Sequence, residues 1–124
     1  MNKPKVLAVD DTLFMLKTIS LALGDDYDVF TLTDPMLVEK FLSQVTPDLI
    51  LLDYQMPDLN GFDLVPVIRK SEKNKNIPII FLTSKSTNDP ESTAAMLGAS
   101  DYIVKPFQAD VLREKVAKYI APKI

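Results

Sequence analysis

Carboxylate, hydroxyl and ammonium side chains stand at the ends of four apolar runs in this sequence. Asp10 and Asp11 follow the first run, Asp53 follows another, and Thr83 and Lys105 follow two more. Converging carboxylates repel by roughly 1 kcal/mol per pair at ~4 Å in water, and by about 4 kcal/mol at an effective dielectric constant of about 20. A hard divalent cation such as Mg²⁺ removes that repulsion. A lysine and a hydroxyl beside the metal could bind a phosphoryl group while a carboxylate attacks it in line.

Each of these side chains also has a simpler interpretation. Asp11 could only cap the helix that follows it, Thr83 could be a turn hydroxyl, and Lys105 could be a solvated surface lysine. However, a need for helix caps and turns would not by itself explain why three acids, a hydroxyl and a lysine follow four separate apolar runs. The combination therefore favours a metal-assisted phosphate site.

The absence of histidine and cysteine from the 124 residues excludes several other kinds of chemistry. Zinc sites with Cys or His ligands, thiolate nucleophiles and serine triads all need these residues. The net charge of −3 and the scattered lysines differ from the basic stripe of a nucleic-acid binder. No apolar stretch approaches the ~20 residues of a membrane span, and no signal peptide is evident. We therefore expect a cytoplasmic protein with no nucleic-acid or membrane partner.

Five short apolar runs alternate with segments that have helical character. Four of the runs are nearly continuous in apolar residues, which is typical of strands buried on both faces. The second run alternates, because Asp28 and Thr31 interrupt it, so we expect it at or near a sheet edge. The runs are Lys5–Val9, Tyr27–Leu32, Leu49–Leu52, Ile77–Leu82 and Tyr102–Val104.

The segments between the runs carry the usual signals of helix starts and ends. Asp34 followed by Pro35 predicts a helix start, and Gly24 and Gly98 predict helix ends. Pro66 lies inside one segment and cannot donate a backbone hydrogen bond, so we expect that helix to start late or to bend. The expected helices cover Thr12–Leu23, a segment that Asp34 and Pro35 open and that carries Val38 to Val45, Phe62–Lys70, Pro90–Leu97 and Ala109–Ile120.

Strand and helix alternate five times, which predicts a parallel sheet with helices on both faces. Five units are too few for an eight-stranded barrel, so an open doubly wound α/β sheet is expected. Such sheets bind ligands at the carboxyl ends of their strands, where the strand order reverses. If the first and third strands flank that point, Asp10, Asp11 and Asp53 converge. We expect one domain over residues 1–124, without linkers, repeats or an attached output domain.

Four motifs resemble the receiver domain of bacterial response regulators, and together they cover nearly the whole chain. They are VLAVDD (Val6–Asp11), LILLDYQMPDLNG (Leu49–Gly61), PIIFLTS (Pro78–Ser84) and GASDYIVKPF (Gly98–Phe107). The resemblance, strongest to single-domain chemotaxis regulators, implies a flavodoxin-like five-stranded sheet of order 2-1-3-4-5.

The resemblance also implies a phosphoacceptor and a metal site. Asp53 would accept a phosphoryl group from a phosphohistidine on a sensor histidine kinase or a histidine phosphotransfer protein. Asp10, Asp11 and Asp53 would hold Mg²⁺ together with the backbone carbonyl of Gln55. Gln55 and Lys85 match positions at which the family tunes the lifetime of the phosphoryl group.

Other residues would take part in binding and switching. Thr83 and Lys105 would bind the phosphoryl oxygens, and Lys105 would pair with Asp53 beforehand. The bond from Lys105 to Pro106 would be cis, which proline makes accessible. Tyr102 matches the switch aromatic, whose ring turns inward as Thr83 moves, although it could equally be a strand aromatic packed under the Pro90–Leu97 helix.

The function implied is a phosphorylation-switched signalling module of a two-component phosphorelay, with an unknown downstream protein target. Such a module catalyses only its own phosphorylation and dephosphorylation, so it is not an enzyme in the usual sense. An aspartyl phosphatase would carry a second Asp where Gln55 stands, and a flavin or nucleotide module would carry a phosphate loop after Val9. A degenerate receiver is disfavoured because every expected site residue is present.

Gly61, in the loop after the phosphoacceptor, is interpreted as a source of backbone freedom.

Overall fold

The computed structural model describes residues 3–56, 61–84 and 88–121. Strands and helices alternate along the chain, with two short 3₁₀ turns, η1 and η2, between them. In order, the elements are β1 (Lys5–Val9), α1 (Leu13–Leu23), β2 (Asp28–Leu32), η1 (Pro35–Leu37), α2 (Val38–Gln44), β3 (Leu49–Asp53), α3 (Gly61–Arg69), η2 (Glu72–Asn74), β4 (Ile79–Thr83), α4 (Pro90–Met96), β5 (Asp101–Val104) and α5 (Ala109–Tyr119).

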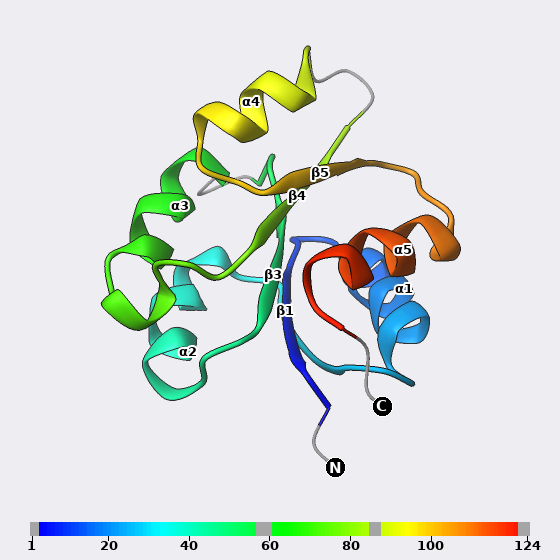
Figure 1. Cartoon of the computed structure of the whole chain (residues 1–124), viewed down its shortest axis with the longest axis horizontal. Coiled ribbons are helices and arrows are strands. Elements are labelled where there is room, and N and C mark those ends of the chain that lie inside the picture. Colours follow the sequence, from blue (N-terminus) through cyan, green and yellow to red (C-terminus); the bar gives the residue numbers. More distant parts are fainter. Residues whose placement is uncertain (1–2, 57–60, 85–87, 122–124) are drawn as a thin grey trace.

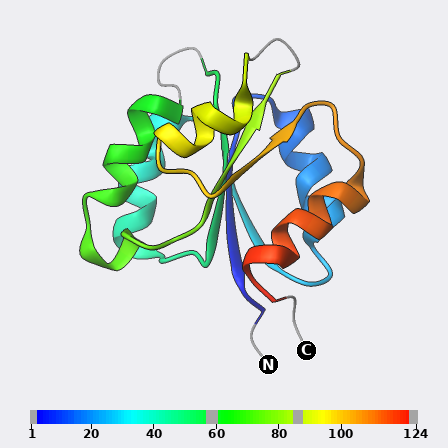
Figure 2. The same cartoon turned by 45° about the horizontal axis from the view of Figure 1, so that its top comes forward.

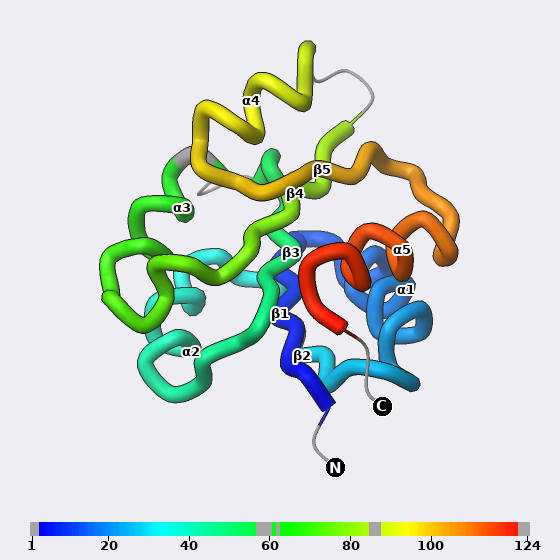
Figure 3. The backbone as a smooth tube through the Cα atoms, viewed as in Figure 1, coloured from blue at the N-terminus to red at the C-terminus, as the bar shows by residue number. Residues whose placement is uncertain are grey.

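The strands of the described chain form one parallel sheet in the order β2-β1-β3-β4-β5. This confirms both the predicted order and the expected edge position of β2. The tube in Figure 3 shows β1 and β3 side by side at the centre of the molecule. The strand order therefore reverses beside β1, where the sequence places its first pair of acids.

Helices cover both faces of the sheet (Figures 1 and 2). On one face, α1 packs beside α5 over a core that includes Leu16, Ile19 and Leu112. On the other face, α2 packs beside α3, while α4 lies against β4 and β5. Phe81, fully buried on β4, is among the largest side chains of this second core. The two cores hold the sheet rigidly, which fixes the positions of residues at the strand ends.

Local chemistry explains the start of η1 and the end of α4. The Asp34 side chain accepts a hydrogen bond from the Met36 amide at 2.9 Å, as expected of a cap, although the first turn is 3₁₀. Gly98 ends α4 with a φ of +81°, and the amides of Gly98 and Ala99 donate to the carbonyls of Ala95 and Ala94. This is a Schellman motif, and the positive φ requires a glycine.

The expectation of a late start for the helix around Pro66 is wrong. The helix α3 begins at Gly61, so Pro66 lies in its interior and leaves the carbonyl four residues earlier without its usual partner. The ring of Pro66 is exposed, whereas Leu64, Val65 and Ile68 are buried. Burial of this apolar face outweighs the missing hydrogen bond and keeps the segment helical.

The interpretation of Gly61 as a source of backbone freedom is also wrong. Among the described glycines, only Gly98 has a positive φ. A Cβ on Gly61 would lie 2.9 Å from Phe81 Cε1 and 3.2 Å from Tyr54 Cδ1. Gly61 is therefore needed because two aromatic rings, which pack at a centroid distance of 5.4 Å, approach its backbone closely.

Candidate functional site

The acids that the sequence places after β1 and at the end of β3 lie together at one edge of the sheet. Because Val9 pairs with Leu52 in the parallel ladder, Asp10 lies beside Asp53. Ligand oxygens of Asp10, Asp11 and Asp53 all lie within 4.8 Å of one another. Asp10 is fully buried, Asp53 is 4% exposed and Asp11 is exposed. The cluster is thus open on one side, and it offers oxygen ligands suited to a hard cation.

Backbone amides fix the orientation of the two buried carboxylates. The Thr12 amide donates to Asp10 Oδ1 at 2.9 Å, and the Gln55 amide donates to Asp53 Oδ1 at 3.2 Å. Each bond closes a short turn directly after a strand, as Asp side chains often do. The carboxylates are therefore held in place before any ligand arrives.

Lys105 reaches this cluster from the end of β5. Its ammonium Nζ lies 2.9 Å from Asp10 Oδ2 and 3.3 Å from Asp53 Oδ1. The Lys105 amide donates to the Thr83 carbonyl at 2.7 Å, and the Lys105–Pro106 bond is cis, as the resemblance implied. The pairing with Asp53 was expected, whereas the shorter contact with Asp10 was not predicted.

Burial and crowding shift the proton affinities of these groups. Burial, helped by the charge of Asp10, raises the pKa of Asp53 from 3.8 to about 7, against the opposing effect of Lys105. Burial alone would lower the pKa of Lys105, but the hydrogen bond to Asp10 and the charges of Asp53 and Asp10 outweigh it and raise that pKa. One ammonium does not balance three carboxylates, so the site favours an additional positive charge.

Thr83 supplies a hydroxyl on β4, the strand next to β3. It is 1% exposed, and among the described residues its Oγ1 has no hydrogen-bond partner. Leaving a buried hydroxyl unpaired costs roughly 1–3 kcal/mol. Asp53 pairs with Leu82, the residue before Thr83, so this donor stands next to the acid cluster. It is available to an oxygen atom that a ligand brings.

Two further residues named from the sequence lie near the cluster. Gln55 is exposed, and its side-chain Oε1 accepts a hydrogen bond from Ser84 Oγ at 3.4 Å. Tyr102 is half-buried on β5, where its ring packs against the core that contains Phe81 and Ala94. Lys85 lies outside the described residues.

Sequence reasoning missed a charged group that contacts Tyr102. Lys115 of α5 places its ammonium 5.0 Å from the centroid of the Tyr102 ring and 2.8 Å from Asp101 Oδ1. The helical pattern puts Lys115 at a partly exposed position, but no sequence signal relates it to a ring on β5. Only the packing of α5 beside that strand reveals the contact.

Comparison with known proteins identifies the family. The model of the response regulator receiver domain matches residues 6–117. The chain belongs to this family. It is therefore a receiver domain of two-component signalling, and its sheet order is the one that the resemblance implied.

Relatives of this receiver domain occur both as small proteins and as parts of large ones. The chemotaxis protein CheY of Pseudomonas aeruginosa is 34% identical over 121 residues, which cover 92% of this chain and 94% of that protein. The hybrid signal transduction histidine kinase D of Dictyostelium discoideum is 35% identical, but the chain spans 8% of its length. The chain likewise spans 27% of a probable cyclic di-GMP phosphodiesterase of Vibrio cholerae.

Solved structures show the same architecture. The chemotaxis response regulator CheY4 of Vibrio cholerae aligns with a TM-score of 0.88 at 29% identity, over 96% of this chain and all of that one.

Within residues 3–56, 61–84 and 88–121, no helix combines the length and apolar character needed to cross a membrane.

Proposed function

We propose that residues 1–124 act as a receiver domain that accepts a phosphoryl group on Asp53 from a phosphohistidine. The donor would be a sensor histidine kinase or a histidine phosphotransfer protein. The observation that supports this proposal is the gathering of Asp10, Asp11 and Asp53 beside the Lys105 ammonium and near the Thr83 hydroxyl, which has no partner in the part of the chain that the structure describes.

The acid cluster fits a magnesium ion. In the proposed site, Asp10, Asp11, Asp53 and the backbone carbonyl of Gln55 would hold Mg²⁺. All of these donors are oxygens, which Mg²⁺ prefers. When bound, Mg²⁺ neutralises charge on the carboxylates and on the incoming phosphoryl oxygens, and it keeps Asp53 ionised at neutral pH.

Phosphoryl transfer in this site forms one bond and breaks one. An Asp53 carboxylate oxygen bonds to phosphorus as the bond from phosphorus to the partner's imidazole nitrogen breaks, and that nitrogen leaves with the bonding electron pair. The Lys105 ammonium and the Thr83 hydroxyl donate to the equatorial phosphoryl oxygens. Water later hydrolyses the acyl phosphate and regenerates the Asp53 carboxylate. In this proposal the domain catalyses only its own phosphorylation and dephosphorylation.

The signal then changes a surface of the domain. When Thr83 bonds to the phosphoryl group, it moves toward Asp53, and the Tyr102 ring follows inward. Both side chains belong to the face of the sheet that α4 covers. The altered surface comprises α4, β5 and α5, and it binds a downstream protein. We place this exchange in the cytoplasm, with no nucleic-acid or membrane partner.

Phosphorylation by a small donor tests the proposal. Incubation with Mg²⁺ and acetyl phosphate should add the mass of one phosphoryl group to the intact protein. Asp53→Asn should remain unmodified, whereas Asp28→Asn, an exposed acid at the opposite edge of the sheet, should be modified like the wild type. Equal modification of Asp53→Asn would contradict the assignment.

A further inference from the structure

The ammonium of Lys115 holds the segment of β5 that carries Tyr102. Its Nζ donates to Asp101 Oδ1 at 2.8 Å and to the Tyr102 carbonyl at 3.1 Å. The same atom lies 5.0 Å from the centroid of the Tyr102 ring, within the range of a cation–π interaction. The Lys115 ammonium thus contacts the Tyr102 carbonyl, the Tyr102 ring and the Asp101 side chain.

Asp101 keeps this ammonium in place. Besides Lys115, it accepts hydrogen bonds from the Tyr102 amide at 2.8 Å and from the Tyr119 hydroxyl at 2.9 Å. Burial alone would raise the pKa of Asp101, but these hydrogen bonds outweigh it and lower that pKa. Asp101 therefore stays ionised at neutral pH, and Lys115 is tied to a fixed carboxylate rather than moving freely in solvent.

Tyr102 belongs both to this anchor and to the proposed switch. Phe81 pairs with Tyr102 and Thr83 pairs with Val104, so the side chains of Tyr102 and Thr83 project from the same face of the sheet. Beside the ring, a cleft of about 420 Å³ opens between α4 and α5, with Ala94 on one wall and Tyr119 on the other. The ring thus lines an open cleft instead of being enclosed on all sides, and its contact with Lys115 must break if it moves away from α5 toward Thr83.

We propose that Lys115 is a positioning residue that holds the Tyr102 ring in its present place and so favours the unphosphorylated conformation. The inference rests on the proposed function, in which Thr83 and Tyr102 move together. A ligand that favours the other conformation must then overcome the contacts that Lys115 makes. Loss of these contacts raises the population of the switched conformation, and a phosphoryl analogue binds the protein more tightly as a result.

Variants of two lysines on α5 distinguish the proposed positioning role of Lys115 from the general effect of removing a surface charge. Lys115→Met removes the charge but keeps most of the side-chain length, and Lys115→Arg keeps both the charge and the cation–π contact. Lys118→Met is the matched control, because Lys118 also lies near Asp101, 3.9 Å from its Oδ2, but stands over Tyr119 at 5.6 Å and is more exposed than Lys115. Asp101→Asn removes the anchor of Lys115 and serves as a second, independent variant.

The first readout is the NMR spectrum of the tyrosine rings in the free protein, in which Tyr102→Phe identifies the Tyr102 resonances among the four tyrosines. Lys115→Met and Asp101→Asn should shift the Tyr102 resonances toward their positions in wild-type protein loaded with Mg²⁺ and beryllium trifluoride. Lys115→Arg and Lys118→Met should leave them near those of the free wild type. A purely structural surface lysine would not produce this pattern.

The second readout is the affinity for beryllium trifluoride in the presence of Mg²⁺. Lys115→Met should raise it about 2- to 5-fold, the range expected for the loss of one exposed cation–π contact. Unchanged Tyr102 resonances and unchanged affinity in Lys115→Met would overturn the role of Lys115 and leave the proposed function intact. If the wild type failed to bind the analogue, the proposed function would fail. The free proteins would still test Lys115, because a ring held by it should change its Tyr102 resonances in Lys115→Met and Asp101→Asn but not in Lys118→Met, whereas unchanged resonances in all three would overturn that role.

Discussion

Asp53 combines two properties that conflict in the metal-free protein. Its carboxylate is buried, which favours the neutral acid, but nucleophilic attack requires the ionised form. Lys105 stabilises the ionised form only partly, because it shares its ammonium with Asp10. A divalent cation resolves this conflict, so the metal-free site should cost stability that the metal-bound site recovers.

Ionisation of Asp53 should lower the stability of the metal-free protein as pH rises. The pKa of Asp53 is about 7 in the folded chain, whereas the ordinary pKa of an aspartate is 3.8. Between these two pH values the folded state binds more protons than the unfolded state, so the free energy of unfolding falls with rising pH. Urea unfolding in EDTA should show this decline in the wild type, and a much smaller one in Asp53→Asn.

The same variants give a comparison at a single pH. At pH 8 without metal, Asp53→Asn should be more stable than the wild type by roughly 1–2 kcal/mol, because it removes a buried charge while Lys105 keeps Asp10. Asp11→Ala should be stabilised less, because Asp11 is exposed. A wild type as stable as Asp53→Asn at every pH would mean that neither the burial of the Asp53 charge nor its repulsion by Asp10 costs stability.

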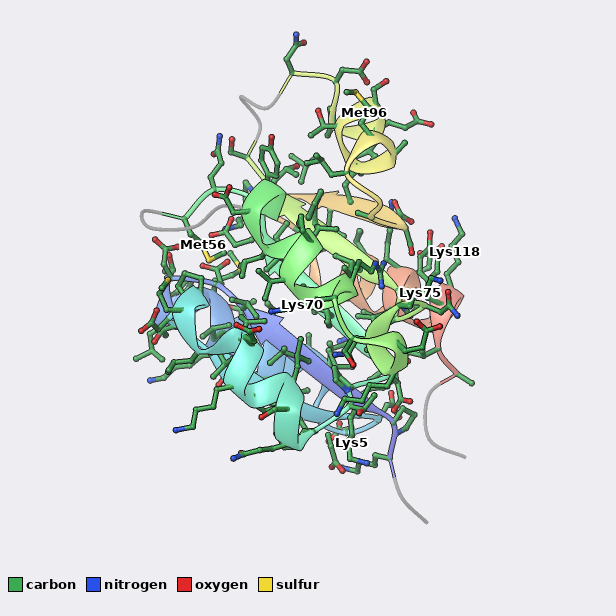
Figure 4. The ribbon with its side chains drawn as sticks, turned by 90° about the vertical axis from the view of Figure 1, so that its left-hand side faces the viewer. Lys5, Met56, Lys70, Lys75, Met96 and Lys118 are labelled. Atoms are coloured by element: carbon green, nitrogen blue, oxygen red, sulfur yellow. The ribbon has the colours of Figure 1, made fainter. Side chains whose placement is uncertain are left out.

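The helix α3 shows how an element can form against its local sequence preferences. It begins with Gly61 and contains Pro66, two residues that disfavour helix, yet its buried side chains hold it against the sheet. In Figure 4, Lys70, the residue after α3, lies near α2, where its ammonium is 3.3 Å from Glu39 Oε2. Burial of its apolar side chains against the sheet therefore outweighs the local preferences, whereas the exposed ion pair of Lys70 contributes little.

Gly61→Ala should destabilise the protein by roughly 1–3 kcal/mol, because the added methyl group would meet the fully buried Phe81 ring at 2.9 Å. Urea denaturation would measure the change. The double variant Gly61→Ala with Phe81→Leu should lose much less relative to Phe81→Leu alone, because the ring is gone. An equal loss in both backgrounds would show that contact with Phe81 is not the reason for the glycine.

Pro66→Ala should stabilise the protein, because it restores an amide donor inside α3 at an exposed position. A helix-interior proline costs up to ~3 kcal/mol relative to alanine, and the stiffer unfolded chain offsets part of this. We expect a net gain of roughly 1–2 kcal/mol in thermal or urea unfolding. Reduced stability would mean that the Pro66 ring makes contacts that outweigh the missing hydrogen bond.

Much of the molecule could be predicted because its sequence signals are local. The run Lys5–Val9 reads as a buried strand, and the structure has β1 at those residues. The apolar run Ile77–Leu82 begins before the strand does, because Pro78 has no amide hydrogen to donate to a neighbouring strand and β4 starts at Ile79. The convergence of Asp10 and Asp53 followed from strand order. The contacts of Lys105 with Asp10, and of Lys115 with Tyr102, depend on side-chain placement across the fold and could not be predicted.

The layered fold separates two working regions of the molecule. The acid cluster lies at the carboxyl edge of the sheet, whereas the cleft between α4 and α5 lies beside the edge strand β5. Figure 4 shows Met96 on α4 and Lys118 on α5, on the two helices that flank this cleft. Thr83 and Tyr102, on adjacent strands, provide the shortest connection between the two regions.

Binding of Mg²⁺ should stabilise the whole domain. At a Mg²⁺ concentration about tenfold above the dissociation constant, the free energy of unfolding should rise by about 1.4 kcal/mol, and the melting temperature should rise with it. Asp10→Asn and Asp53→Asn should lose most of this gain. The same gain in Asp53→Asn as in the wild type would place the metal elsewhere.

The position of the phosphoryl group decides whether Asp53 is the acceptor. After incubation with acetyl phosphate and Mg²⁺, proteolysis and mass spectrometry should locate one phosphoryl group on the peptide that contains Asp53, and hydroxylamine should remove it, as expected for an acyl phosphate. EDTA during the incubation should prevent the modification. A hydroxylamine-resistant phosphoryl group on a serine or threonine, or no modification with Mg²⁺ present, would contradict phosphoryl transfer to Asp53.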